Sequence, residues 1–292
     1  AARLFPRLTL PPSVYMPELP EVELVARSLD MLVRGRRISE AALVRERLAP
    51  ETPPNEFAQL LSGAVIRSVN RRGKHILFDL DNGHTLVVHL RMSGRFLLLG
   101  EQHENPKFTH AIFQLDDGSR LIFDDQRHFG MMKIARTAEL SNARELQKLA
   151  PEPFSDEFSP AYLFNAFRSS KRSLKDVLLD QTKVCGLGNI YAAEAMFLAG
   201  IHPAKSASKL SRKRTTRLYE TIRGVLAEAI EAGSTLNVDP ENPEIGYYGG
   251  RYESYWRVYG REGQSCPTCE TPIVRLKQSG RSSFYCRKCQ QK

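Results

Sequence analysis

The sequence predicts an α+β protein built from an antiparallel β domain, a helical domain and a small cysteine-bearing hairpin, in that order. Residues 37–136 alternate apolar and polar side chains as strands do, whereas residues 160–232 repeat them with helical spacing. Four of the five cysteines lie near the end of the chain. A chain of 292 residues has room for about two domains that each bury a core.

The composition is typical of a soluble globular protein with a polyanionic partner. Hydrophobic residues make up 41% and charged residues 26% of the chain, and the net charge is +9. This positive excess favours nucleic acid first and an anionic membrane surface second. No apolar run reaches the roughly 18 residues that indicate a membrane span, so we expect no membrane partner.

The segment Met16–Glu23 carries the first candidate site. If translation starts at Met16 and this residue is removed, Pro17 has a free amine, and an α-amino group titrates near about 7.7–8.0. Such an amine can attack a sugar carbon, with Glu18 beside it as a proton carrier. The alternative is a proline-capped helix start. Residues 1–15 make a poor secretory signal, and we expect the natural chain to begin at Met16.

The next elements are one helix and a series of strands. Apolar spacing from Val22 to Val33 predicts a helix. Short runs of period two, separated by turns rich in Gly and Asp, then predict strands. These strands are Ala64–Val69, Ile76–Leu80, Thr85–Leu90, Phe96–Leu99, Ala111–Leu115 and Arg120–Phe123. We expect them to form an antiparallel sandwich or barrel.

Residues 151–153 predict a linker, and after it the apolar residues recur with helical spacing. The predicted helices are Pro160–Arg168, Ser173–Leu179, Ile190–Ala199 and Ser208–Ala232, with Gly200 and Gly233 at the ends of the last two. Asn189 is a good N-cap for the third helix, and the N–H groups of such a helix start can hold a phosphate. Residues 234–251 are rich in Gly, Pro and Asn and predict a long loop.

The terminal cysteines predict a metal site. Two Cys-x-x-Cys pairs, separated by sixteen residues, consist of Cys266, Cys269, Cys286 and Cys289. Four thiolates suit one tetrahedral Zn²⁺, and a site with four protein ligands has no open position, so we expect a structural ion. The spacer predicts a hairpin that presents Arg281 to phosphate or, alternatively, serves as a protein-binding ribbon. The fifth cysteine, Cys185, is expected to be a small buried residue.

Three strand ends combine charged and apolar residues with glycines: Arg71–His75, His89–Arg95 and Asp124–Gly130. Met92 and Phe129 are ordinary core residues in one interpretation. Exposed at strand ends, they would instead form a wedge that fills a duplex where a base has been removed. Arg127 would then donate hydrogen bonds to the partner base left unpaired.

Met-Pro-Glu-Leu-Pro-Glu-Val-Glu at 16–23, Gly-Leu-Gly-Asn-Ile-Tyr at 186–191 and the terminal Cys₄ hairpin together resemble the formamidopyrimidine-DNA glycosylases. This is a helix-two-turn-helix family of bacterial base-excision repair enzymes. The resemblance runs from Met16 to the end of the chain. It implies an N-terminal β-sandwich at 16–148, a helix-two-turn-helix domain with a base-capping loop at 149–255, and a zinc finger at 256–292. Residues 1–15 form an extension outside the family pattern.

The resemblance also implies roles for individual residues. Pro17 would be the Schiff-base nucleophile at the deoxyribose C1′, and Glu18 its acid/base partner. Lys74 would contact phosphate and donate a proton in β-elimination, and Arg281 would grip phosphate for δ-elimination. The implied DNA contacts are His89, Lys171 and Asn189 on phosphates, and Met92, Arg127 and Phe129 in the void left by the flipped base.

The function implied by the resemblance is a bifunctional DNA glycosylase and abasic-site lyase that excises 8-oxoguanine and formamidopyrimidines. The expected partner is damaged double-stranded DNA. We expect the protein to act as a monomer in the bacterial cytoplasm, with one structural Zn²⁺ and no small-molecule cofactor. Two alternatives remain. One is an endonuclease VIII-like glycosylase for oxidised pyrimidines, and the other is a zinc-dependent DNA-binding protein without activity if Pro17 is blocked.

Three features depart from the family pattern. His128 stands where a second arginine is common, and Phe108 stands where a DNA-contacting histidine is frequent. The loop Ser234–Arg251 would cover the flipped purine, and its residues Asn237–Tyr248 have an unusual sequence for the family. At His128 we therefore expect a backbone contact that is absent or depends on pH.

Overall fold

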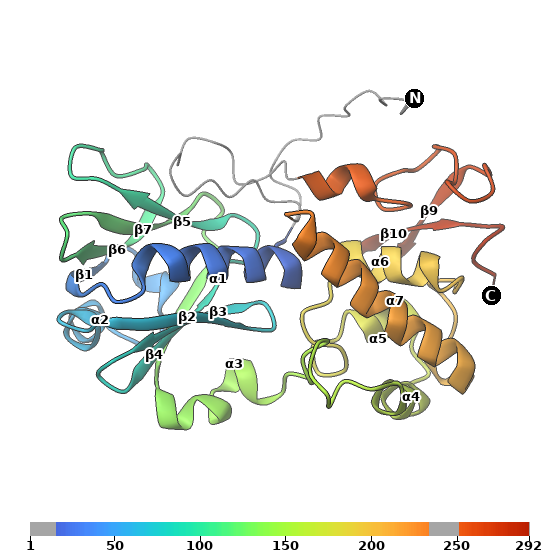
Figure 1. The fold of residues 1–292 in the computed structure, drawn as a ribbon, viewed down its shortest axis with the longest axis horizontal. Helices are drawn as coiled ribbons and strands as arrows, with labels where there is room; N and C mark the ends of the chain where they lie inside the picture. The colour runs from blue at the N-terminus through green and yellow to red at the C-terminus, as the bar shows by residue number, and fades with distance from the viewer. Residues whose placement is uncertain (1–15, 234–250, 292) are drawn as a thin grey trace.

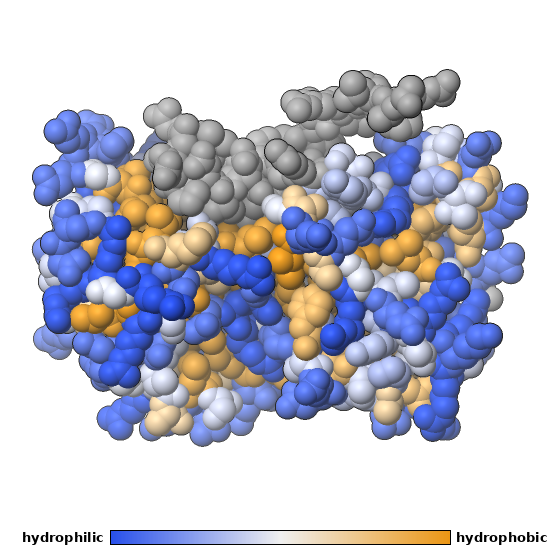
Figure 2. Space-filling view, viewed as in Figure 1, coloured by the Kyte–Doolittle hydropathy of each residue, from blue (hydrophilic) through white to orange (hydrophobic). Residues whose placement is uncertain are grey.

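The computed structural model describes residues 16–233 and 251–291, which form a β-rich half and a helical half; helix α1 (Leu19–Val33) lies across the β-rich half and reaches the helical half (Figure 1). The expectations for residues 1–15 and for the loop 234–250 lie outside the described residues. On the face shown in Figure 2, hydrophilic residues cover much of the described surface, with hydrophobic patches between them on both halves. Within the described ranges, no helix combines the length and the apolar character needed to cross a bilayer.

Two four-stranded antiparallel sheets form the first half and confirm the predicted sandwich. One sheet has the order β1-β6-β7-β5, with strands Ile38–Leu43, Thr109–Leu115, Arg120–Asp125 and Gly94–Leu99. The other has the order β2-β3-β4-β8, with strands Ile66–Arg72, His75–Leu80, His84–His89 and Met131–Arg136. Alternate residues of each strand point inward, and together with α1 and α2 (Pro54–Leu61) they build one apolar core.

Sequence reasoning missed β1, β8 and α2. In β1 the register shifts between Ile38 and Glu40, so its burial does not alternate regularly. In β8 the pattern is weak, because only Met132 is fully buried. Pairing with β6 and β4, respectively, forms these two strands, which shows how strongly strand formation depends on neighbours.

The helical half contains α4 (Pro160–Arg168), α5 (Leu174–Leu178), α6 (Asn189–Leu198) and α7 (Arg212–Glu231) around a second core. The predicted helix 208–232 is divided, because a short 3₁₀ turn (η3, Ala207–Lys209) precedes α7 and Ser211 caps it by accepting from Arg214 N–H. Gly200 and Gly233 follow α6 and α7 with positive φ, as predicted for C-terminal caps.

Helix α1 belongs to both halves. Leu19 in its first turn lies in the core of the helical half, whereas Val22 to Val33 pack into the sandwich core. The N-terminal segment is thereby held where the two halves meet. This placement brings residues 16–18 close to the start of α6, far away in the sequence.

Three further 3₁₀ or short helical segments connect these elements: η1 (Glu46–Leu48), η2 (Thr137–Asn142) and α3 (Arg144–Gln147). C-terminal to residues 234–250, which are not described, η4 (Arg251–Tyr255) leads to the terminal hairpin of β9 (Ile273–Gln278) and β10 (Arg281–Cys286). Gln290 joins the hairpin to the helical half, because its Nε2 donates to Ile201 O at 2.9 Å.

Candidate functional site

Pro17 and Glu18 are buried at the first turn of α6. The Glu18 carboxylate accepts from Gly188 N–H at 2.7 Å and from Ile190 N–H at 2.8 Å. A helix N-terminus favours an anion, so this carboxylate replaces a local cap. The prediction that Asn189 is the N-cap is wrong, because Gly188 holds that position and Asn189 is the first helical residue. The N–H groups expected to hold a phosphate hold Glu18 instead.

The glycines of the 186–191 motif make this contact possible. A Cβ on Gly188 would overlap the Glu18 carboxyl group, and one on Gly186 would lie 2.7 Å from Leu19 Cδ1. Gly186 also has φ +76°, which L side chains rarely adopt. Close packing of the N-terminal segment on α6 therefore requires both glycines.

Glu21 and Lys74 complete the charged surroundings of Glu18. Glu18 N–H donates to Glu21 Oε2 at 2.9 Å, and Tyr191 OH donates to Glu21 Oε1 at 2.5 Å. Burial raises the pKa of Glu18 to about 7, with Glu21 adding to the rise and Lys74 opposing it. Burial likewise lowers the pKa of Lys74, which is only 9% exposed. A carboxyl group with a pKa near neutrality can both donate and accept a proton.

The turn that carries Lys74 is fixed by Glu152 of the predicted linker. Glu152 Oε1 accepts from Gly73 N–H at 2.6 Å and also lies 3.0 Å from Arg72 Nη1. The other carboxylate oxygen, Oε2, lies 2.8 Å from Arg71 Nη1. Arg71 also pairs with Glu23 of α1 at 2.8 Å. Sequence reasoning treated residues 151–153 as a simple connection and missed this half-buried clasp between the halves.

Asn189 and the buried Lys175 hold the terminal hairpin. Asn189 Nδ2 donates to Ser282 O at 3.1 Å, and Lys175 Nζ donates to the same oxygen at 2.6 Å and to Ser283 Oγ at 2.7 Å. Burial lowers the pKa of Lys175 to about 8, with Asp176 opposing and Arg281 contributing. Arg281 is the exposed first residue of β10. Its positive charge helps to lower the pKa of Lys175 and also that of Lys74.

The candidate Lys171 is exposed four residues before Lys175, and its carbonyl accepts from Ser206 Oγ. Sequence reasoning chose Lys171 and missed Lys175. The signal for Lys175 was its position three residues before Leu178 on a helix, which places both side chains on one face. A lysine among core residues indicates a buried partner.

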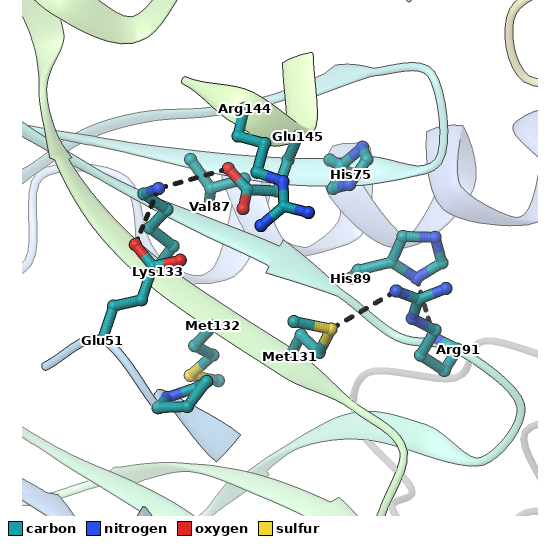
Figure 3. Close-up of a pocket in the computed structure, with 11 residues that line it drawn as sticks. Glu51, His75, Val87, His89, Arg91, Met131, Met132, Lys133, Arg144 and Glu145 are labelled. Atoms are coloured by element: carbon teal, nitrogen blue, oxygen red, sulfur yellow. Dashed lines mark hydrogen bonds and ion pairs between the residues drawn. The ribbon is translucent and has the colours of Figure 1, made fainter. Parts of the chain in front are cut away.

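His89 lies at a pocket of about 330 Å³ on the outer side of the β3-β4-β8 strands (Figure 3). Its Nδ1 accepts from Arg91 N–H at 3.0 Å, and its ring meets that of His75 edge-on. Burial lowers the pKa of His89 well below its ordinary value. Figure 3 shows Lys133 between Glu51 and Glu145 at the far side. Pro17, Glu18 and Lys74 are not part of its lining.

The wedge candidates come from two adjacent loops. Phe129 is 50% exposed, and the Arg127 guanidinium lies 5.5 Å from the centre of its ring. Arg127 N–H donates to Ser93 Oγ at 3.0 Å, and Ser93 Oγ donates to Asp125. These bonds join the loop that carries Met92 to the loop that carries Arg127 and Phe129. The structure thus brings the three side chains to neighbouring positions on the sandwich, and Phe129 is not a core residue.

The terminal cysteines fit one structural zinc ion. Their four Sγ atoms all lie within 4.8 Å of one another, with Cys266–Cys289 at 3.9 Å and Cys269–Cys286 at 3.4 Å. Four sulfurs at ~2.3 Å from a tetrahedral zinc are about 3.8 Å apart. Zinc would tie the end of β10 to the segment before β9. Cys185 is buried as predicted, and burial raises the pKa of its thiol to about 12.

Three family models match the chain in the order of its parts. The formamidopyrimidine-DNA glycosylase N-terminal domain matches residues 16–132, and the H2TH domain of the same family matches residues 149–239. The zinc finger found in FPG and IleRS matches residues 263–292.

Similar proteins extend over almost the whole chain. A formamidopyrimidine-DNA glycosylase of Jannaschia sp. is 45% identical over 287 residues, covering 94% of this chain and 100% of the relative. One from Bacillus licheniformis is 43% identical over 279 residues, with 95% and 100% covered. Among solved structures, a Lactococcus lactis FPG mutant in complex with Fapy-dG containing DNA matches with a TM-score of 0.87 and 32% identity, covering 94% of this chain and 100% of that one. The chain belongs to the formamidopyrimidine-DNA glycosylase family, whose members are DNA repair enzymes with glycosylase and abasic-site lyase activities.

Proposed function

We propose that this chain excises oxidised purines from damaged double-stranded DNA through a Schiff base at Pro17, followed by β- and δ-elimination. The observation that carries the proposal is Glu18, a buried carboxyl group next to Pro17 with a pKa of about 7. Backbone N–H groups of helix α6 hold this carboxyl group in place, and the positive charge of Lys74 partly offsets the rise of its pKa. A proton donor and acceptor is thus fixed beside the nucleophile.

The chemistry begins with attack of the Pro17 nitrogen on C1′, which breaks the glycosidic bond as the damaged base leaves with a proton. The sugar ring opens to give an iminium ion between Pro17 and C1′. Loss of a C2′ proton then expels the 3′ phosphate, and a second elimination expels the 5′ phosphate. Glu18 is the group that moves protons in the first steps, and Lys74 donates in β-elimination.

The proposed DNA surface lies along both halves. Phosphates would contact His89, Lys171, Asn189 and Arg281. Met92 and Phe129 would fill the vacated space, and Arg127 would donate to the O2 and N3 acceptors of an opposite cytosine. The division into 16–148, 149–255 and 256–292 is part of the same proposal. It is supported by two separate apolar cores and a hairpin with its own metal site.

The partner and setting follow from the same comparison. Lactococcus lactis Fpg has been solved with an abasic site containing DNA, and the net charge of +9 of this chain suits such a polyanion. We further propose that the protein acts as a monomer in the bacterial cytoplasm and needs no small-molecule cofactor.

Borohydride trapping tests the Schiff base directly. Since an amide nitrogen is not nucleophilic, the protein must begin at Pro17, which mass spectrometry of the protein purified from its natural host verifies first. Reduction in the presence of 8-oxoguanine duplex should give a covalent adduct through Pro17. A matched protein that retains Met16 should give none. No adduct with a verified Pro17 terminus would leave only DNA binding without chemistry.

Excision of 8-oxoguanine and of thymine glycol from otherwise identical duplexes tests the substrate class. We expect faster excision of 8-oxoguanine. The comparison matters because Lactococcus lactis Fpg has also been solved with an oxidized pyrimidine containing DNA. A clear preference for thymine glycol would replace the proposal with the endonuclease VIII-like alternative.

A further inference from the structure

His128 lies in a cluster of nitrogen-bearing side chains below the wedge loop, defined as residues 126–130. Arg45 Nη1 lies 3.0 Å from His128 Nδ1, and His110 Nε2 lies 2.9 Å from the same nitrogen. The two imidazole rings stack with their centres 5.0 Å apart. Arg45, His110 and His128 are named the histidine cluster below.

The protonation state of this cluster follows from Arg45. A guanidinium is always charged and only donates hydrogen bonds. His128 Nδ1 must therefore carry a lone pair, and His110 Nε2 must carry a proton that it donates to that lone pair. His128 is thus neutral in this arrangement, with its own proton on Nε2. A second proton on His128 would point at the Arg45 guanidinium and break both contacts.

The acidic groups near the cluster have other partners. Burial lowers the pKa of His110, with Asp125 and Asp124 opposing and with His128 and Arg45 adding to the effect. The two oxygens of Asp125 accept from Ser93 Oγ and from the N–H groups of Arg127 and Gly130. Asp124 pairs with Arg95 at 2.9 Å.

The cluster is attached to three separate parts of the sandwich. The backbone of Arg45, after β1, is fixed by its N–H donating to His110 O at 3.1 Å. His110 is 3% exposed in β6. His128 lies between Arg127 and Phe129, with φ +61° in the left-handed region. A non-glycine residue there needs fixed contacts, and the cluster provides them.

Phe108 packs edge-on against His128, with ring centres 5.9 Å apart. This contact further restrains the His128 ring.

We propose that His128 is a positioning residue that fixes the wedge loop through Arg45 and His110 and thereby places Arg127 and Phe129 before DNA is bound. The inference rests on the proposed function insofar as the wedge enters DNA, but the state of the cluster can be tested without DNA. Loss of the His128 contacts should weaken insertion of the wedge and leave the chemistry at Pro17 intact.

The first test uses the protein alone. In ¹⁵N-histidine NMR spectra at pH 8, we expect His128 to carry its proton on Nε2 and His110 to carry one on its Nε2. Comparison with His128→Asn assigns the signals among the seven histidines of the chain. A proton on His128 Nδ1 at pH 8 would overturn the proposal, whatever the protein does to DNA.

The second test follows wedge insertion with 2-aminopurine beside an uncleavable tetrahydrofuran site. At pH 7.5, His128→Ala should lose about fivefold in wedge insertion, the equivalent of one net hydrogen bond. His128→Asn should keep its insertion within about twofold, because asparagine tolerates positive φ and accepts from Arg45.

His103→Ala is the matched control, since His103 is exposed on another loop of the sandwich, and it should insert the wedge as the wild type does. Full insertion by His128→Ala at pH 7.5 would show that the cluster does not position the wedge loop. Borohydride trapping of each variant at pH 7.5 reports separately on Pro17, so failure of the proposed chemistry is distinguishable from failure of this inference.

Discussion

At the scale of single residues, the environment of Glu18 is the central feature. Its carboxylate accepts from backbone N–H groups of α6, which favours the charged form, but burial outweighs them and raises its pKa to about 7. A carboxyl group whose pKa is raised by the fold contributes stability below its unfolded value, near about 4.3. That stability is lost as the pH rises through about 7. The proton-transfer role that we propose for Glu18 therefore comes at some cost to folding at alkaline pH.

Glu18→Gln should slow excision of 8-oxoguanine by about 100-fold or more in single-turnover assays, the usual contribution of a general acid/base. The amide keeps the size of the side chain, so affinity for lesion DNA should persist. Thermal unfolding at pH 6 and pH 8 should differ less in the variant than in the wild type, because the titrating group is gone. Glu104→Gln, at an exposed position, is the control. Retained turnover in Glu18→Gln would remove this residue from the chemistry.

At the scale of elements, the start of α6 and the terminal hairpin decide whether the site is assembled. The first turn of α6 receives Glu18 only because residue 188 has no side chain. On the other side of the same turn, Asn189 reaches Ser282 of the hairpin, which Lys175 also holds. One helix start therefore aligns the N-terminal segment, which we propose to be catalytic, with the hairpin of the four cysteines.

Gly188→Ala should displace Glu18 and abolish most of the excision activity, since the added Cβ would overlap its carboxyl group. Gly224→Ala, within α7, is the matched control, because nothing lies within 4 Å of a Cβ at that position. The control should be as active as the wild type and more stable by about 0.5–1 kcal/mol, the helix preference for alanine. Single-turnover excision and thermal unfolding of both variants check this, and an active Gly188→Ala protein would contradict it.

Removal of zinc should release the hairpin from Lys175 and Asn189 and weaken binding to a duplex with a tetrahydrofuran site. The hairpin presents exposed cations, among them Arg281 and Lys277. The slope of the logarithm of the binding constant against the logarithm of the salt concentration reports the number of phosphate contacts. This slope should decrease in magnitude by about one for each phosphate that the released hairpin no longer binds. Affinity measured across salt concentrations, in a sample shown to be metal-free and again after zinc is restored, provides the test. Unchanged affinity without metal would argue against a role for the hairpin in binding.

At the scale of the whole molecule, the two halves are joined by α1 and by the clasp of Arg71, Arg72 and Glu152. Leu19 lies in one core and the rest of α1 in the other, so the halves share an element. Although burial opposes it, Arg71 holds the pKa of Glu152 below its usual value. The clasp therefore contributes stability above the ordinary glutamate range, and this stability is lost as the pH falls below about 4.3.

Glu152→Gln should destabilise the protein by on the order of 1–2 kcal/mol, because it leaves the largely buried Arg71 with one carboxylate in place of two. It should also make stability fall less steeply in acid. Thermal or urea unfolding at pH 7 and pH 4 measures both effects, with Glu157→Gln at an exposed position as the control. Equal stability of the Glu152→Gln protein and the wild type at pH 7 would show that the clasp does not hold the halves together.

The local pattern of the sequence determined most of the elements. Period-two strands, helical spacing and the two Cys-x-x-Cys pairs predicted the sandwich, the helices and the zinc hairpin, because each depends mainly on neighbouring residues. The exceptions, β1, β8 and α2, carry weak patterns that pairing and packing complete.

The sequence by itself also named Pro17 and Glu18 as candidates, since their chemistry belongs to the residue types. Only the tertiary structure decided that Glu18, and not Asn189, caps α6, that Lys175 holds the hairpin, and that His128 meets His110 and Arg45. These contacts join residues far apart in the chain. Burial, which sets their pKa values and hydrogen bonds, exists only after the halves have packed.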